Sequence, residues 1–358
     1  MLADVRVVDL SQYIPGPFAT RQLADLGAEV IKIEPPGGDP MRRFMQQDSS
    51  APSAVYRHLN RGKRVCELDL KSATGCRALE DLLATADILL ESFRPGVLAR
   101  LGFGRERIDA LNPRLIHCAL SGYGQTGPYA QRAGHDINYC ALSSQAIVSG
   151  SAERPVIGYP PIADHAAALQ AAVAMLAALH ARDNQRSSIY LDISMTESIL
   201  SWQYLPLLTG ADQRAANILN GAAACYNLYR TADEAFVSLG AIETVFWDNF
   251  CSAVERPQWI ERQYQTMPQH QLIDEVSALF TTRPLAYWQD LLDPVDCCFE
   301  VLFTAGQLAR HPQFEARAAL NANGPTYPAR INQQAVATAI DFEQIDDPRQ
   351  LDWRASAG

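Results

Sequence analysis

The first 35 residues alternate apolar runs with a helix-like segment, and this alternation constrains the fold more than any other feature. Residues 5–10 (VRVVDL) and 29–35 (EVIKIEP) are apolar, β-branched runs typical of buried strands. Between them, SQYIPGP predicts a turn, and FATRQLADLG predicts a helix that ends at Gly27. A strand, a helix and a second strand within about 30 residues form a βαβ unit, which begins a parallel sheet.

The same alternation continues through the first half of the chain. Further strands are predicted at 64–70, 87–93, 114–122 and 187–194, with helices over 73–86 and in the Ala-rich segment after Asp164. Continuous apolar strands are buried on both faces, so helices must cover both sides of the sheet. The sequence therefore predicts an α/β protein with a doubly wound parallel sheet.

The pattern changes after about residue 195, which predicts a second domain. MTESILSWQYLPLLTG (195–210) predicts a helix that leaves the sheet. Two strands then flank a turn at 231–233, and helical segments follow around 245–254, 270–281 and 285–292. We expect a large domain over 1–195 and 322–358, a smaller α+β domain over 225–308, and linkers at 196–224 and 309–321.

Composition excludes several classes of function. The net charge is −10 and no run of Lys or Arg occurs, so we expect no nucleic-acid partner. The eight cysteines are scattered without a C-x-x-C pair, which favours free thiols in a reducing compartment. The N-terminus lacks a signal-peptide pattern, and the apolar stretch 166–181 is shorter than the ~20 residues that span a bilayer. We expect a soluble, cytoplasmic protein without a membrane partner.

A glycine motif after the strand at 114–122 satisfies the letter of the dinucleotide-binding fingerprint. Gly122-x-Gly124-x-x-Gly127 is followed by Pro128 and a polar segment, without an amphipathic helix of useful length. The fingerprint binds pyrophosphate because a helix N-terminus follows it immediately. We therefore interpret these glycines as a tight loop rather than a nicotinamide or flavin site.

Several long motifs together resemble those of CoA-transferase family III (the CaiB/BaiF family), which includes the α-methylacyl-CoA racemases. The resemblance covers nearly the whole chain, through VRVVDLSQYIPGPFATRQLADLGAEVIKIEPPGGDP, LNRGKRVCELDLK, ADILLESFRPGVLARLG, NPRLIHCALSGYGQTGPY, AGHDINY, IADHAAAL, LYRTADEAFVSLGAIE and ARHPQFEAR. It implies an interlocked homodimer, in which each chain passes through a hole in its partner. It also implies that the large domain is Rossmann-like and binds CoA.

The resemblance to racemases implies three catalytic residues. His135 of GHDINY and Asp164 of IADH are the acid/base pair, and Glu243 of GAIE supports them. Taken alone, His135 is a polar loop residue, Asp164 is an N-cap of the helix that follows, and Glu243 is an exposed residue after a strand. Racemases usually have a Gly-rich turn after the Asp, whereas this chain has His165-Ala166-Ala167-Ala168.

The same resemblance places the CoA part of the substrate. The cations expected near its phosphates and adenine are Arg42, Arg43, Lys63, Arg94 and Arg100, since Arg and Lys bind phosphate well. Gly134 and Tyr139 are expected at the thioester end. No metal or redox cofactor is expected, because CoA enters only as the carrier part of the substrate.

Three functions remain open at this point. Inversion of the carbon next to a thioester needs one acid/base group on each face, and His is suited to this because it titrates near neutrality. In a CoA-transferase, Asp164 is instead a nucleophile that attacks the acyl-CoA carbonyl. A third possibility is a CoA-ester-binding protein without turnover. We expect a 2-methylacyl-CoA racemase, and the sequence does not specify the acyl group.

Overall fold

The computed structural model describes residues 1–46, 48–182 and 188–353. The chain divides into two compact units. The first comprises Met1–Ser143, Tyr159–Trp202 and His311–Gly358, and the second comprises Ser144–Gly158 and Gln203–Arg310. The domain limits of the sequence analysis stay a prediction.

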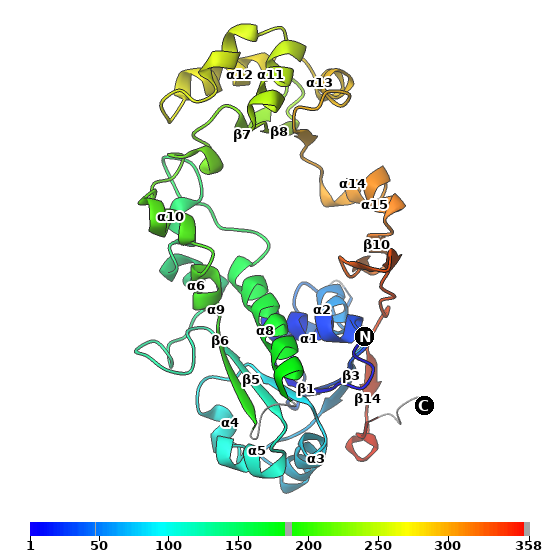
Figure 1. Cartoon of the computed structure of the whole chain (residues 1–358). Helices are drawn as coiled ribbons and strands as arrows, with labels where there is room; N and C mark the ends of the chain where they lie inside the picture. The colour runs from blue at the N-terminus through cyan, green and yellow to red at the C-terminus, as the bar shows by residue number, and fades with distance from the viewer. Residues whose placement is uncertain (47, 183–187, 354–358) are drawn as a thin grey trace. The chain divides into compact units, whose positions relative to one another are not determined.

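The first unit is built on a seven-stranded, fully parallel sheet (Figure 1). Its strand order is β14-β3-β2-β1-β4-β5-β6. The strands are β1 (Arg6–Leu10), β2 (Glu29–Glu34), β3 (Arg64–Glu67), β4 (Ile88–Glu91), β5 (Ile116–Ser121), β6 (Ile189–Ser194) and β14 (Glu343–Ile345). The last of these returns from the C-terminal segment and pairs with β3 at the sheet edge.

Helices cover both faces of this sheet, as the buried central strands require (Figure 1). One face is packed by α1 (Pro15–Asp25) and α8 (Ile162–Ala181). The other carries α3 (Ala73–Leu83), α4 (Val97–Arg100) and α5 (Arg105–Leu111), whose Leu and Ile side chains join a core with β1, β2 and β4. The predicted doubly wound α/β class is therefore confirmed.

Other elements of this unit are short. They are α2 (Ala54–Asn60), α6 (Asp136–Leu142), α9 (Met195–Leu200), α15 (Pro312–Ala316), and two hairpins made of β10 (Leu320–Asn321), β11 (Gly324–Pro325), β12 (Arg330–Ile331) and β13 (Gln334–Ala335). After β5, the glycine motif forms a loop in which Gly124 and Gly127 have positive φ. The next helix, α6, begins only at Asp136. This geometry lacks the helix start that a dinucleotide fingerprint needs.

The strand order fixes where a ligand site lies in the first unit. The chain runs outward from β1 to β2 and β3 in one direction, then crosses back to β4 and continues to β5 and β6. The order therefore reverses between β1 and β4. In open α/β sheets, ligands bind beyond the carboxyl ends of the strands at such a reversal.

The helix α8 is longer and more apolar than the sequence analysis expected. It is 20 residues long, and by length and composition alone it could cross a membrane, whereas the predicted apolar stretch covers only 166–181. In the structure α8 contacts α1, α9, β5 and β6. Its buried face is lined mostly by alanines, including Ala167 and Ala171, together with Met175, so it is a core helix of this unit.

The second unit has a small antiparallel sheet packed by helices. Its strands, in the order β7-β8-β9, are β7 (Tyr226–Arg230), β8 (Phe236–Gly240) and β9 (Phe299–Val301). The helices are α7 (Gln145–Val148), α10 (Tyr204–Thr209), α11 (Thr244–Ala253), α12 (His270–Phe280), α13 (Leu285–Leu292) and α14 (Ala305–Leu308). Its core is aromatic, with Phe280 in contact with Tyr229, Phe250 and Trp288.

The helix predicted over 195–210 is in fact two helices, α9 and α10. Pro206 explains the break. Within a continuous helix, Pro206 lacks the N–H that would bond to the Trp202 carbonyl, and its ring clashes with that carbonyl. The chain therefore ends α9 at Leu200 and starts α10 at Tyr204, which places Pro206 in the first turn.

Candidate active site

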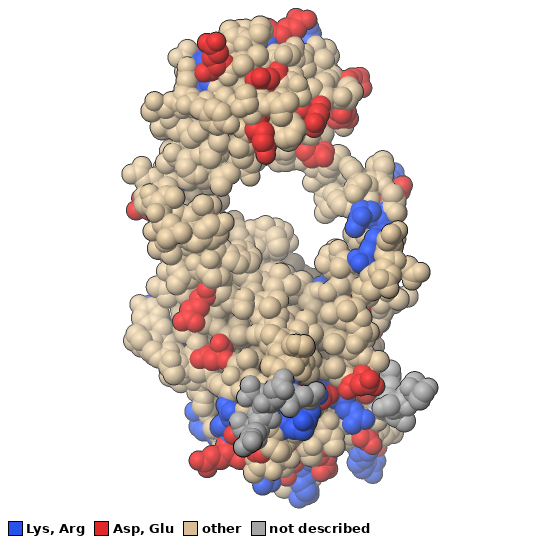
Figure 2. All heavy atoms as spheres, in the orientation of Figure 1, with Lys and Arg blue, Asp and Glu red and all other residues tan. Residues whose placement is uncertain are grey.

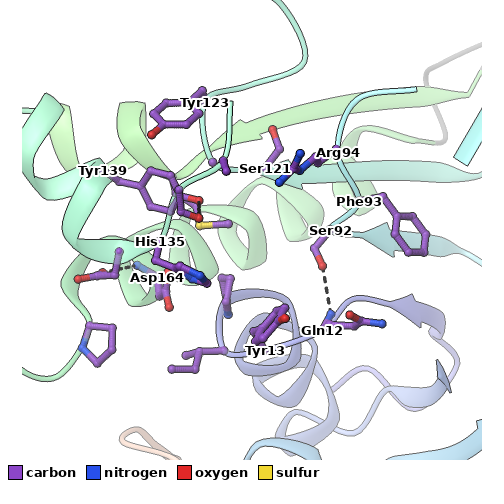
Figure 3. A pocket seen from close by; sticks show the side chains of 18 of the residues that line it. Gln12, Tyr13, Ser92, Phe93, Arg94, Ser121, Tyr123, His135, Tyr139 and Asp164 are labelled. Atoms are coloured by element: carbon purple, nitrogen blue, oxygen red, sulfur yellow. Dashed lines mark hydrogen bonds between the residues drawn. The ribbon is translucent and has the colours of Figure 1, made fainter. Parts of the chain in front are cut away.

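A cavity of about 710 Å³ opens at the carboxyl ends of β1, β4 and β5 (Figure 3). Its walls include residues 12–15 after β1, 92–95 after β4, 121–123 after β5 and 132–136 before α6, together with Tyr139 and Asp164. All of these residues belong to the first unit. The cavity thus lies at the reversal of strand order, where α/β sheets bind ligands.

His135 is the N-cap residue of α6 and lines this cavity. Its backbone N–H donates to the side-chain Oδ1 of Asn138 at 3.0 Å, and the backbone N–H of Asn138 donates to the His135 carbonyl at 2.8 Å. This reciprocal capping fixes the backbone at His135. The imidazole is exposed, and the ring of Tyr13 meets it edge-on at a centroid distance of 6.4 Å. The ring therefore faces the cavity in a defined position (Figure 3).

Asp164 lies in the first turn of α8 and lines the same cavity. Burial, followed by the nearby charge of Asp136, raises the pKa of Asp164 to about 7. A carboxyl group with such a pKa is present in both its protonated and ionised forms near neutral pH. It can therefore donate a proton in one direction of a reaction and accept one in the other.

The expectation that Asp164 caps its own helix is wrong. The N-cap of α8 is Pro161, and Asp164 follows three residues later, inside the helix. The capping oxygen comes from another element, because Oδ1 of Asp136 accepts the backbone N–H groups of Ala163 at 2.6 Å and Asp164 at 3.1 Å. The side chain of Asp164 is thus not used for capping.

The four residues after Asp164 pack inside the fold and do not line the cavity. Nδ1 of His165 lies 2.6 Å from the Pro161 carbonyl oxygen, and its ring packs edge-on against Phe18 at 4.8 Å. The three alanines at 166–168 are buried within the first unit. Their Cβ atoms therefore pack inside the fold, and none of the three lines the cavity.

Glu243 is the N-cap residue of α11 in the second unit. It is exposed, and its carbonyl accepts the amides of Phe246 and Trp247. It does not line the described cavity, whose walls come from the first unit. Its role in supporting His135 stays a prediction.

Three residues expected to contact CoA line the cavity. Arg94 follows β4, and its guanidinium forms no ion pair with any residue that the structure describes. The Tyr139 hydroxyl donates to the Gly134 carbonyl at 2.6 Å. A Cβ on Gly134 would lie 2.7 Å from the Tyr123 hydroxyl and 2.8 Å from Cε1 of Tyr139, so only glycine fits without displacing these rings.

The other predicted CoA contacts do not line the cavity. Arg43 and Arg100 are exposed on the surface of the first unit. Arg42 is engaged, because its Nε donates to Glu34 at 2.6 Å and its guanidinium lies over the Tyr56 ring at 4.6 Å. Tyr56 and Glu34 are themselves hydrogen-bonded at 2.6 Å, so Arg42 is part of a fixed cluster.

The prediction that Lys63 contacts CoA disagrees with its position. Lys63 is 1% exposed. Its Nζ donates to Oδ2 of Asp9 at 3.1 Å, to the Pro17 carbonyl at 2.9 Å and to Oδ1 of Asn60 at 3.0 Å. All three protons of the ammonium group are used inside the protein, which leaves none for a phosphate.

Sequence reasoning missed three cavity residues. Asp136 directly follows His135 in the quoted motif, and an acidic residue at a helix start is a signal that was available. Arg132 lies three residues before His135, and its guanidinium stacks over Tyr129 at 4.5 Å. Tyr13 lines the cavity with a positive φ of 65°, a conformation that the sequence does not reveal.

Comparison with known proteins assigns the chain to a family. The family model "CoA-transferase family III" matches residues 2–350. The chain is 33% identical to α-methylacyl-CoA racemase of Mus musculus over 340 residues, which cover 92% of this chain and 84% of that protein. It is 34% identical to succinyl-CoA–D-citramalate CoA-transferase of Chloroflexus aurantiacus over 370 residues, which cover 99% of this chain and 90% of that protein.

A solved structure supports the same assignment at the level of the fold. A CaiB/BaiF family protein from Brucella suis has a TM-score of 0.79 at 24% identity, covering 94% of this chain and 93% of that one. The relatives include racemases and CoA-transferases, so they indicate an enzyme family rather than one reaction. The chain belongs to CoA-transferase family III, the CaiB/BaiF family.

Proposed function

We propose that the protein is a racemase or epimerase of 2-methylacyl-CoA thioesters. One observation carries the proposal: His135 and Asp164 line a single cavity, and burial with a neighbouring carboxylate raises the pKa of Asp164 to about 7. Inversion at the α-carbon needs a base on one face and an acid on the other. A histidine and a carboxylic acid of near-neutral pKa meet this need in both directions.

In the proposed mechanism, one of the two groups removes the α-proton and the electron pair moves into the thioester as an enolate. The other group, which carries a proton, then delivers it to the opposite face of the same carbon. The two residues exchange roles in the reverse direction, so no net proton is consumed. Glu243 is proposed to support His135 by holding its tautomer, as supporting carboxylates do.

The CoA part of the substrate is proposed to enter over Arg94. This guanidinium lines the cavity and is not neutralised by any described carboxylate, so it can receive an anionic phosphate. Gly134 and Tyr139 line the thioester end. Arg42, Arg43 and Arg100 stay candidates for the outer phosphates and adenine, whereas Lys63 is not carried forward. The reaction uses no group beyond these side chains and the substrate itself.

We also propose that the chain works as a homodimer. In the first unit, Val173 on α8 is 61% exposed, and Leu169 is also exposed. In the second unit, Leu208 on α10 is 82% exposed and Leu207 is exposed beside it. Figure 2 shows few charged side chains over α10 on the face in view. Apolar side chains exposed on this scale are typical of surfaces that another chain covers.

The second candidate function is a CoA-transferase, which the match to a succinyl-CoA–D-citramalate CoA-transferase over 99% of the chain favours. Here an oxygen of Asp164 attacks the thioester carbonyl, and the C–S bond breaks to release CoA thiolate and form an acyl-aspartyl anhydride. The thiolate next attacks the Asp164 carbonyl carbon, forming an aspartyl-CoA thioester and releasing the donor acid. An acceptor carboxylate then takes CoA through a second anhydride. His135 has no required role in this sequence.

Isotope exchange separates these functions. The protein is incubated with one epimer of a 2-methylacyl-CoA in deuterated water without an acceptor acid. We expect deuterium at the α-carbon, loss of chirality, and losses of more than about 10³-fold in His135→Ala and Asp164→Asn, typical of removing an acid/base group. CoA transfer that needs an added carboxylic acid and persists in His135→Ala would overturn the racemase in favour of the transferase. Binding of CoA ester without either reaction would indicate a protein without turnover.

A further inference from the structure

Asp136 connects the two helices that carry the proposed acid/base pair. It is the first residue of α6, directly after His135. Its Oδ1 accepts the backbone N–H groups of Ala163 and Asp164, at 2.6 Å and 3.1 Å, across a separation of 27 and 28 residues. The Asp136 side chain therefore hydrogen-bonds the backbone next to His135 to the backbone at Asp164.

The start of α8 needs such an acceptor. The first four N–H groups of a helix have no partner within the helix, and an N-cap side chain usually accepts one or two of them. The N-cap of α8 is Pro161, which has no side-chain acceptor. Asp136 supplies the missing acceptor from α6, so the position of the first turn of α8 depends on it.

We propose that Asp136 is a positioning residue that holds Asp164 in the cavity that His135 also lines, and that its negative charge disfavours ionisation of the Asp164 carboxyl. This inference rests on the proposed function for its catalytic meaning. The geometry carries the first part, since two hydrogen bonds to a helix start fix where Asp164 projects. The 3.1 Å contact between the Asp136 carboxylate and the Asp164 backbone nitrogen carries the second, because like charges near each other disfavour joint ionisation.

Several titratable groups line the cavity with Asp164 or lie beside it in the fold. They are His135, Asp136, Tyr139 and Cys140 from α6 and its cap, His165 from α8, Tyr13 from the loop after β1, and Arg94 from the loop after β4. Burial raises the pKa of Asp164 first, and Asp136 raises it further. Removal of the Asp136 charge alone therefore lowers the pKa of Asp164 without changing its burial.

Two substitutions separate the two parts of the role. Asp136→Asn keeps an oxygen that can accept both N–H groups but removes the charge. Asp136→Ala removes both the acceptor and the charge. Leu142→Ala is the control, because Leu142 lies on the same helix as Asp136 and its side chain is exposed.

The first measurement needs no turnover. Amide hydrogen exchange at Ala163 and Asp164 is compared among the variants. The carboxyl group of Asp164 is titrated by following its carboxyl carbon resonance by NMR, and this resonance is assigned by its absence in Asp164→Asn. We expect exchange at both amides to rise at least tenfold in Asp136→Ala and to stay within threefold of wild type in Asp136→Asn and Leu142→Ala. The pKa of Asp164 is expected to fall by at least half a unit in Asp136→Asn.

The second measurement is the pH profile of α-proton exchange, or of CoA transfer if the wild type transfers instead, since Asp164 reacts in both. Asp136→Ala is expected to lower kcat by 10- to 100-fold with KM changed less than threefold. Asp136→Asn is expected to keep kcat at its optimum within fivefold while the limb controlled by Asp164 moves to lower pH. Unchanged amide exchange and an unchanged Asp164 titration would overturn the inference, whichever reaction the wild type catalyses. A wild type with neither reaction would overturn the proposed function alone.

Discussion

Two aspartates in the first unit, Asp9 and Asp164, have opposite electrostatic surroundings. Asp9 lies near the carboxyl end of β1. Burial alone would raise its pKa, but Lys63 and Lys32 lower the pKa to about 2. Asp164 is also largely buried, but its neighbour is the carboxylate of Asp136, and its pKa rises to about 7. The same side chain is therefore a permanent anion at one position and a group that titrates near neutral pH at the other.

The difference shows how the fold separates stability from chemistry. Asp9 accepts hydrogen bonds from Ser11, Thr20 and Lys63, and this network ties down the loop that leads to Gln12 and Tyr13 in the cavity wall. No side-chain donor to the carboxylate of Asp164 is present among the described residues. Lysine charges and hydrogen bonds keep Asp9 ionised at neutral pH, whereas burial and the Asp136 carboxylate raise the pKa of Asp164 so that it titrates there.

The largest expected effect comes from Lys63→Met, which removes the cation that lowers the pKa of Asp9 most. The variant leaves a buried carboxylate without its closest cation, so we expect a loss of about 3–5 kcal/mol in the free energy of unfolding at pH 7. The pKa of Asp9 then rises, so the variant is less destabilised as the pH falls toward 4 and Asp9 becomes protonated. Urea unfolding at the two pH values measures both effects.

The control for this substitution is Lys71→Met, because Lys71 is exposed and forms no ion pair with the rest of the described chain. It is expected to change the free energy of unfolding by less than about 0.5 kcal/mol. Equal, small effects of Lys63→Met and Lys71→Met would show that the buried pair does not stabilise the fold. In that case Asp9 and Asp164 would not differ in the way described.

The next effect sharpens the comparison on the Asp164 side. The folded-state pKa of about 7 lies above the ordinary value of 3.8, so the folded protein binds more protons than the unfolded chain between these values. The stability of the wild type therefore falls as pH rises through this window. Asp164→Asn lacks this dependence and should be more stable than wild type, with a gain about 2 kcal/mol larger at pH 8 than at pH 5.

Asp81→Asn is the matched control, because Asp81 is exposed on α3. Its unfolding free energy should stay within about 0.5 kcal/mol of wild type at both pH values. A gain for Asp164→Asn that is equal at pH 5 and pH 8 would contradict a raised pKa. Stability gained together with lost activity is expected where a site is tuned for chemistry rather than for folding.

Sequence predicted the sheet and the cavity residues better than it predicted the charge pairs. The apolar runs at 5–10 and 29–35 are local signals, and β1 and β2 form there. The motifs with His135 and Asp164 likewise lead to residues that line one cavity. Pairing across the chain has no such local signal: Lys63 reaches Asp9 over 54 residues, and nothing in its immediate sequence distinguishes it from a solvated lysine.

The prediction that Asp164 caps α8 failed for the same physical reason. An aspartate just before a helical run is a good local N-cap signal, and Asp164 satisfies it. The acceptor is instead Asp136, 28 residues away, because the packing of α6 against α8 brings its carboxylate to the helix start. Pro206 is the opposite case, because its effect on the helix is local. The single helix predicted over 195–210 was therefore wrong although the sequence carried the signal for the break.

The smallest expected effect tests how much each donor matters to Asp9. Ser11 donates to Oδ1 of Asp9 with both its hydroxyl and its backbone N–H, the latter at 2.9 Å. Ser11→Ala removes only the hydroxyl, so we expect a loss of about 1 kcal/mol in the free energy of unfolding at pH 7, measured with urea. An unchanged midpoint would show that Lys63, Thr20 and the backbone already satisfy Asp9. Asp9 would then differ from Asp164 through its lysines, and the hydroxyl donor of Ser11 would contribute nothing to that difference.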